Sequence, residues 1–451
     1  MLKLVDPTLN LFTYTLKQGL GVEESETRKI YRRFLAGLPK QLHKKLGVSF
    51  NAEKKQKFLA VDKVKEADLT FTGNLHNHRV EGRYRRWNDT DNYQLLFDGY
   101  VDDKYETGQV IELIKDLQYL TPELPKLENI GQTWMLSGSL ESGTDAEAEE
   151  LAKKAYKNLF KKDGVPQGIG EFLGGKVAEF WGDKIEDNLQ LLVILYPDDA
   201  AFRECAVFYE HWLDLLCFRH KIIWAYENSL LLKERLVTNY NQIVAIRNTS
   251  RLNLPKLLEA MGKLSDFAID LNYLELQYST INVNLEKYEN KLVEMQAKAR
   301  PTDDLQFLQV FCDDAKTKYP KQIKKDIDNF RPCLEILQSL TDTIRGTVEI
   351  RKAESDRSFQ NFVGIVGVGL STGGTIASAS ANYKTEIEAN PVINTAINTL
   401  FPLFEPGSGL RIIMGFTIIS GLAASLLTWI IIVVLPCIFR YLWGLITGKK
   451  W

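Results

Sequence analysis

Two long stretches near the C-terminus of this 451-residue chain carry no charged side chain, and they constrain its fold more than any other feature. The first lies between Arg357 and Lys384, and the second runs from Ile412 to Phe439. Each exceeds the roughly 20 residues that cross a bilayer as a helix. Burying both in a soluble core would need more apolar cover than the polar preceding chain provides. We therefore expect transmembrane helices over 358–383 and 411–440.

The basic residues that flank these stretches predict their orientation. Lysine and arginine gather on the cytoplasmic side of membrane helices. They are in excess before the first stretch and after the second, whereas the loop between them, 384–410, carries Glu386, Glu388 and Glu405. We expect an integral protein of the inner or plasma membrane, with both termini cytoplasmic and a basic, aromatic tail over 441–451.

Composition excludes several other classes of protein. The net charge is −2 and 25% of the residues are charged, so no basic excess points to nucleic acid. The five cysteines form no C-x-x-C pair, which suits reduced thiols in the cytosol. Asp6 and Pro7 interrupt the apolar N-terminus before a signal peptide could form.

Helical periodicity dominates the region 201–357. Apolar residues from Ile323 to Val348 recur at alternating steps of four and three, which is typical of a coiled-coil or bundle seam. This seam predicts a long stalk helix that leads into the first span. A second helix is expected around Leu257–Leu285 and a third over 202–246. The stalk helix should begin near Thr302, with Asp303 and Asp304 in its first turn.

The first 200 residues have a different character. Short β-rich segments such as "DLTFTGNL", "VEGRYRRW" and "YQLLFDGYV" alternate with turn residues, whereas "DAEAEELAKKAYKNLFKK" is typical of a helix. We expect a cytosolic α/β domain over 1–200. The whole chain is therefore predicted to be α+β, with a helical stalk region and a C-terminal two-helix membrane hairpin.

Small residues define two faces of the first predicted span. One face could line a narrow polar conduit of hydroxyl and carbonyl groups; its residues are Gly364, Gly367, Ser371, Gly374, Thr375 and Ser378. The other is a ladder that lets helices pack closely in lipid; its residues are Gly369, Gly373 and Ala377. The alternative is that both faces only pack against other helices.

The acidic loop suggests a vestibule. Copied around a symmetric ring, the carboxylates of Glu386, Glu388 and Glu405 would concentrate cations at the mouth of a pore. A solvated loop without such a role is the alternative.

An arginine-rich segment is the candidate ligand site of the cytosolic part. Arg79, Arg83, Arg85 and Arg86 could bind an anion or a nucleotide, or could form a charged strand edge that discourages aggregation. The segment "GEFLGGKV" matches only part of a phosphate loop, because Val177 replaces the magnesium-binding hydroxyl. No catalytic constellation is present, so we do not expect an enzyme.

The order of these segments resembles the CorA family of magnesium transporters. The resemblance implies a homopentameric funnel embedded in membrane lipid, with the first spans lining the pore and a regulatory divalent cation as the only cofactor. The Gly-Met-Asn signature that closes the first span in this family is absent, and "SASANY" stands in its place. This departure leaves the transported ion open.

Two functions follow from these features. The first is a CorA-like homo-oligomeric channel for cations, gated by its cytosolic domain. The second is a membrane-anchored sensor or effector, whose arginine-rich strand binds a small cytosolic ligand such as a nucleotide signal.

Overall fold

A computed structural model describes residues 2–17, 24–47, 51–60, 66–76, 78–89, 91–125, 127, 129–182, 187–249 and 252–352. Among these residues, no helix is both long and apolar enough to cross a membrane. The predicted spans, the loop and the tail, 358–451, lie outside the described residues. The described chain is α+β, as expected, with a mixed sheet and several helices.

The chain divides into two compact units. The first comprises Met1–Leu231 and Leu274–Asp326, and the second comprises Leu232–Tyr273 and Ile327–Trp451. The first unit contains the whole sheet and the helices that cover it. Each of the three long helices contributes one portion to the first unit and one portion to the second.

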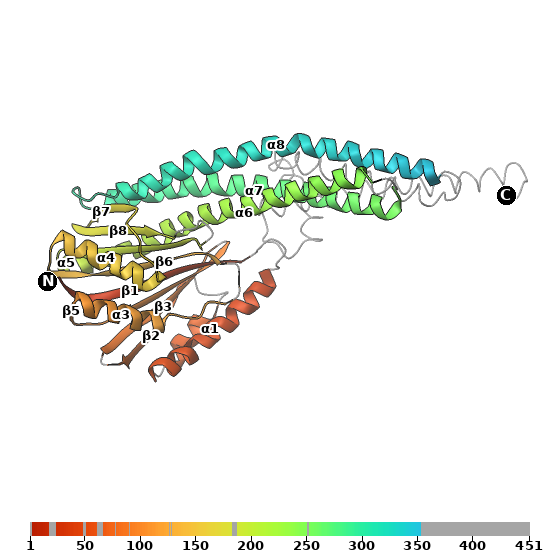
Figure 1. Cartoon of the computed structure of the whole chain (residues 1–451). Helices are drawn as coiled ribbons and strands as arrows, with labels where there is room; N and C mark the ends of the chain where they lie inside the picture. Colours follow the sequence, from red (N-terminus) through yellow and green to blue (C-terminus); the bar gives the residue numbers. More distant parts are fainter. Residues whose placement is uncertain are drawn as a thin grey trace, which may run out of the picture. The chain divides into compact units, whose positions relative to one another are not determined.

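The nine strands form one sheet in the order β2-β3-β4-β1-β6-β9-β8-β7, and β5 pairs with the start of β1 (Figure 1). Neighbouring strands are antiparallel except β6 and β9, which are parallel. The strands are β1 Lys3–Leu16, β2 Glu66–Leu75, β3 His78–Asn88, β4 Asn92–Tyr100, β5 Lys104–Glu106, β6 Asn129–Ser142, β7 Gly168–Phe172, β8 Gly175–Trp181 and β9 Leu189–Tyr196.

Four helices cover the first face of the sheet. They are α1 Glu24–Leu46, α2 Ala52–Leu59, α3 Thr107–Leu120 and α4 Asp145–Phe160. Their apolar stripes join strand residues such as Leu9, Leu11 and Phe97 in one buried core cluster. The burial of apolar surface therefore holds this layer in place.

The second face of the sheet is covered by helices from the C-terminal half of the described chain. After the short helix α5 (Asp199–Glu204), the first half of α6 (Tyr209–Arg247) packs on this face. Tyr14 Oη donates a hydrogen bond of 2.9 Å to the Leu213 carbonyl, and Asn10 Nδ2 donates one of 3.1 Å to Tyr209 Oη. Several polar side chains are buried here; they are Asn10, Gln94, Thr133, Glu179 and Gln190.

The described part of the second unit consists of portions of three helices. It holds the second half of α6, the first half of α7 (Leu254–Lys298) and the second half of α8 (Gln306–Lys352). All three helices contribute to one small buried core; its residues are Ile246, Leu257, Ala260, Met261, Ile344 and Val348. The predicted seam from Ile323 to Val348 lies within α8, and both of these end residues are buried. The long helix is therefore confirmed.

The start of this helix was predicted wrongly. Helix α8 begins at Gln306 rather than near Thr302. The reason is that the Asp303 carboxylate accepts hydrogen bonds from the backbone N–H groups of Leu173 and Gly174, at 2.8 and 2.9 Å, and so holds the β7–β8 turn. Asp304 Oδ1 accepts the Gln306 N–H instead, at 2.9 Å. The 202–246 helix is likewise divided, because α5 and a 3₁₀ turn precede α6.

Candidate functional site

The arginine-rich segment lies on β3, and the guanidinium groups that project from one side of it form ion pairs. Arg79 Nη2 lies 3.0 Å from Glu81, Arg83 Nε lies 3.0 Å from Asp98, and Arg85 Nε lies 3.0 Å from Asp68. Burial raises the pKa of Asp98, and the Arg83 guanidinium opposes that rise. An anionic ligand at these arginines would compete with carboxylates already in place.

Arg86 points to the opposite face of the sheet. It is fully buried and donates hydrogen bonds of 3.1 Å to the carbonyls of Phe58 and Ala60 at the end of α2. Because residues alternate between the two faces along a strand, Arg86 lies on the opposite face from Arg83 and Arg85, and its hydrogen bonds there have a structural role. Ligand binding by these arginines stays a prediction, and Arg86 is the least accessible of them.

The phosphate-loop-like segment is a β-hairpin. Gly170 and Val177 pair across β7 and β8, and Leu173 and Gly174 make the turn with positive φ values of 52° and 73°. A phosphate loop instead joins a strand to a helix N-terminus. This segment therefore has a different geometry from a phosphate site.

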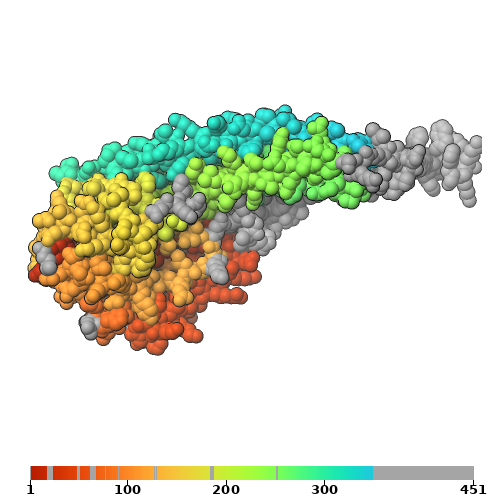
Figure 2. All heavy atoms as spheres, in the orientation of Figure 1, coloured from red at the N-terminus to blue at the C-terminus, as the bar shows by residue number. Residues whose placement is uncertain are grey.

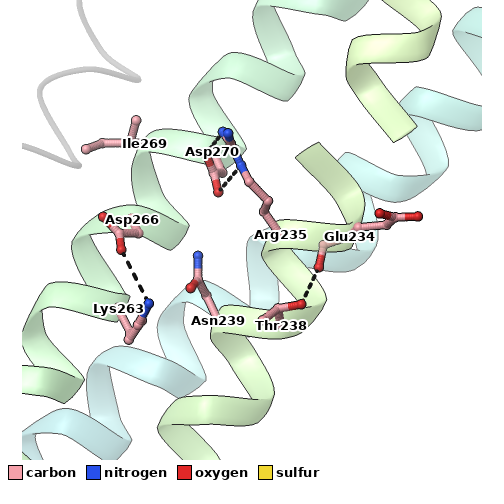
Figure 3. Close-up of a pocket in the computed structure, with 8 residues that line it drawn as sticks. All are labelled: Glu234, Arg235, Thr238, Asn239, Lys263, Asp266, Ile269 and Asp270. Atoms are coloured by element: carbon pink, nitrogen blue, oxygen red, sulfur yellow. Dashed lines mark hydrogen bonds and ion pairs between the residues drawn. The ribbon is translucent and has the colours of Figure 1, made fainter. Parts of the chain in front are cut away.

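The second unit contains a polar groove between α6 and α7, with a cavity of about 520 Å³ (Figure 3). A cavity of this volume falls in the range that holds small molecules. Its lining residues are Glu234, Arg235, Thr238, Asn239, Lys263, Asp266, Ile269 and Asp270. The helices bring together side chains that lie about 30 residues apart in the sequence, and we did not predict this groove.

Two ion pairs of unequal strength border the groove. The Arg235 guanidinium makes a two-point contact with the Asp270 carboxylate, with Nε 3.1 Å from Oδ2 and Nη2 close to Oδ1. Asp270 is buried, which strengthens this pair. Lys263 and Asp266 lie 4.0 Å apart and both are partly exposed, so water or a ligand can replace their weak contact.

Asn239 lies between the two ion pairs (Figure 3). It is only 7% exposed. A carboxamide offers both donors and an acceptor. Together with Lys263 and Asp266, it makes the groove suited to a small polar ligand that carries both donor and acceptor groups.

The remaining predicted site residues lie outside the described residues. These are the conduit face, the packing ladder and the acidic vestibule, namely Gly364, Gly367, Ser371, Gly374, Thr375, Ser378, Gly369, Gly373, Ala377, Glu386, Glu388 and Glu405. Within the described ranges, no group of three or more His, Cys, Asp or Glu side chains is arranged to hold a metal ion.

Comparison of this chain with family models, with curated proteins and with solved structures gives no match.

Proposed function

We propose that this protein is a homo-oligomeric membrane channel for cations, built like CorA and gated by its cytosolic part. The observation that carries the proposal is α8. This helix of 47 residues, about 70 Å long, starts beside the sheet and ends at Lys352, just before the first uncharged stretch. A continuous helix of this kind can transmit a change in the cytosolic part to a membrane span.

The first span would form the conduit in this proposal. The face from Gly364 to Ser378 would line it, the Gly369, Gly373 and Ala377 ladder would pack against a neighbouring helix, and the acidic loop would attract cations. Membrane lipid and further copies of the chain are the partners. By resemblance the assembly is a pentamer and the ion is divalent, such as Mg²⁺.

Flux through liposomes tests the channel directly. Purified full-length protein is reconstituted, and Mg²⁺, K⁺ and Cl⁻ fluxes are measured in parallel for the wild type and for Gly367→Leu. The matched control is Ile365→Leu, a neighbouring substitution off both the proposed conduit face and the packing ladder. We expect cation flux in the wild type and the control and none in Gly367→Leu. Equal flux from a well-assembled Gly367→Leu oligomer would refute the assigned conduit.

The polar groove favours a second candidate function, a membrane-anchored sensor. Asn239 offers an amide on the wall of the groove, and a nucleotide supplies matching donor and acceptor groups. The test is thermal stabilisation of the full chain by adenine and guanine nucleotides. Asn239→Leu should abolish a shift that Thr280→Val, a substitution at a half-buried position elsewhere on α7, retains. A shift that is equal in both variants would exclude the groove.

A further inference from the structure

A continuous chain of buried polar side chains crosses the second face of the sheet in the first unit. It links Asn188, His220, Thr133, Gln190 and Glu179, which come from the segment before β9, from α6, β6, β9 and β8. Each is at most 6% exposed. The hydrogen bonds among these five side chains determine how many protons they must hold together.

Asn188 fixes one end of this chain. Its Nδ2 donates to the carbonyls of Ile130, at 2.5 Å, and His220, at 2.9 Å, so its Oδ1 must be the atom that faces the imidazole. His220 Nδ1 lies 2.7 Å from that oxygen and therefore carries a proton. In a neutral imidazole the other nitrogen, Nε2, is then an acceptor.

The Thr133 hydroxyl is the next link. Its oxygen lies 2.7 Å from His220 Nε2 and 2.8 Å from one end of the Gln190 amide. The other end of that amide lies 2.5 Å from Glu179 Oε1. A hydroxyl has one proton to donate, and a glutamine amide has one donor end and one acceptor end.

A neutral His220 and an ionised Glu179 cannot both fit this chain. If Thr133 donates to His220, the Gln190 amino group must face Thr133, and its carbonyl then faces the Glu179 carboxyl group. If Thr133 donates to Gln190 instead, two lone pairs meet at His220 Nε2. One more proton is therefore needed, either on His220 or on Glu179.

Burial decides between these two positions. A proton on His220 leaves an imidazolium and a carboxylate in the interior beside the Arg219 guanidinium, whereas a proton on Glu179 leaves both groups neutral. Burial lowers the pKa of His220 well below its usual value, and Arg219 lowers it further. Burial also raises the pKa of Glu179, although Arg219 opposes that rise.

The position of Arg219 agrees with a protonated Glu179. The nearest Arg219 nitrogen lies 3.8 Å from the Glu179 carboxyl group, beyond hydrogen-bonding distance. Tyr288 from α7 also faces Glu179, and burial raises the pKa of its phenol well above the usual value, so it is neutral.

We propose that Glu179 is a buried proton-binding site, a carboxylic acid that donates a hydrogen bond to Gln190 and so completes a neutral chain through Thr133 to His220. Loss of this proton would force the Gln190 amide and the Thr133 hydroxyl to reverse. Because His220 belongs to α6, the proton links the protonation of the sheet to the docking of that helix. The proposal concerns the first unit alone and does not depend on the proposed channel.

Infrared spectroscopy of the full-length protein tests the proposal. The samples are the wild type, Glu179→Gln and the control Glu171→Gln, in a detergent without ester groups at pH 7. Glu171 is a suitable control because it lies on the neighbouring strand β7 and pairs with Lys176 at the surface. We expect a carboxylic acid C=O band in the wild type and in Glu171→Gln, shifted in D₂O, and no such band in Glu179→Gln.

Identical spectra for the wild type and Glu179→Gln would overturn the proposal. So would failure of Glu179→Gln to fold when Glu171→Gln folds, since a neutral amide should replace a neutral acid. A second measurement needs no variant at Glu179. In ¹⁵N-histidine-labelled protein, the signals that His220→Asn removes should be those of a neutral imidazole protonated at Nδ1, and an imidazolium would contradict the proposal.

Discussion

The two faces of the sheet are buried by different means. On the first face, α1 to α4 and the strands share a large apolar cluster that includes Leu9, Leu95 and Phe97. On the second face, the same strands present Asn10, Gln94 and Thr133 to α6, next to apolar residues such as Phe12 and Met135. Figure 2 draws the heavy atoms as spheres from one side and shows the outer surface of these elements, not the residues buried on either face of the sheet.

The contrast shows two ways of attaching a helix to a sheet. Apolar burial is strong but non-directional, so related packings of the first layer differ little in free energy. Hydrogen bonds have strict geometry, and a buried donor or acceptor without its partner costs about 1–3 kcal/mol. The polar contacts of the second face therefore fix the position of α6 along the sheet. A change in the protonation of Glu179 can release this helix.

The largest effect is expected on the apolar face. Phe97 is fully buried, with its ring centroid 5.3 Å from that of Tyr84 and 6.2 Å from that of Phe71. Phe97→Ala should lower the free energy of unfolding by about 3–5 kcal/mol, because it removes apolar burial and leaves a cavity. Chemical denaturation of the full chain measures this. A loss below about 1 kcal/mol would contradict the assigned core.

A smaller effect is expected where α6 touches the sheet. A Cβ atom at Gly131 would lie 2.4 Å from His220 Nδ1, so Gly131→Ala should displace the imidazole and lower the free energy of unfolding by about 1–3 kcal/mol. Gly108→Ala is the matched control, because nothing lies within 4 Å of its added Cβ. Equal stabilities of the two variants would show that α6 does not dock tightly at β6.

The third effect is a pH dependence on the polar face, where the expected change in the free energy of unfolding for one pH unit is the smallest of the three. The folded-state pKa of Glu179 is raised above its ordinary value of 4.5, so its contribution to stability is complete below pH 4.5 and is lost as the pH rises through the folded-state pKa. Glu179→Gln lacks this titration. The free energy of unfolding of the variant minus that of the wild type should therefore grow with pH between 4.5 and the folded-state pKa of Glu179, by at most about 1.4 kcal/mol per pH unit, and stay constant at higher pH.

Denaturation curves of both proteins between pH 4.5 and pH 7 measure this difference. His220 is present in both, so its own titration cancels. A difference that stays constant with pH, or that changes in favour of the wild type, would mean that Glu179 is ionised in the folded protein.

Sequence periodicity predicted the helical part of the fold well and the polar sites poorly. The seam in α8 was readable because Ile323, Ile327 and Leu337 repeat along one helix and meet partners that any apolar helix can supply. The groove was not readable from the sequence, since Arg235 and Asp270 come together only once α6 and α7 pair. For the same reason, nothing near Thr133 indicates that it meets His220.

Strand β1 was missed for a local reason. Asp6 and Pro7 break its alternating pattern, and we used them only to argue against a signal peptide. In the structure they form an irregularity: the β1–β6 register shifts between Val5 and Thr8, and Asp6 adopts a positive φ of 52°. Such bulges interrupt the sequence pattern of a strand without ending it.

The central position of β1 has a consequence for biosynthesis. This strand is made before its partners β4 and β6, and the parallel partner of β6 is β9, which ends at Tyr196. Folding rates fall as contacts become more distant in sequence. The nascent chain must therefore carry β1 without its neighbour β4 until Tyr100 has been made, and without its other neighbour β6 until Ser142 has been made. This interval is when chaperones would be needed most.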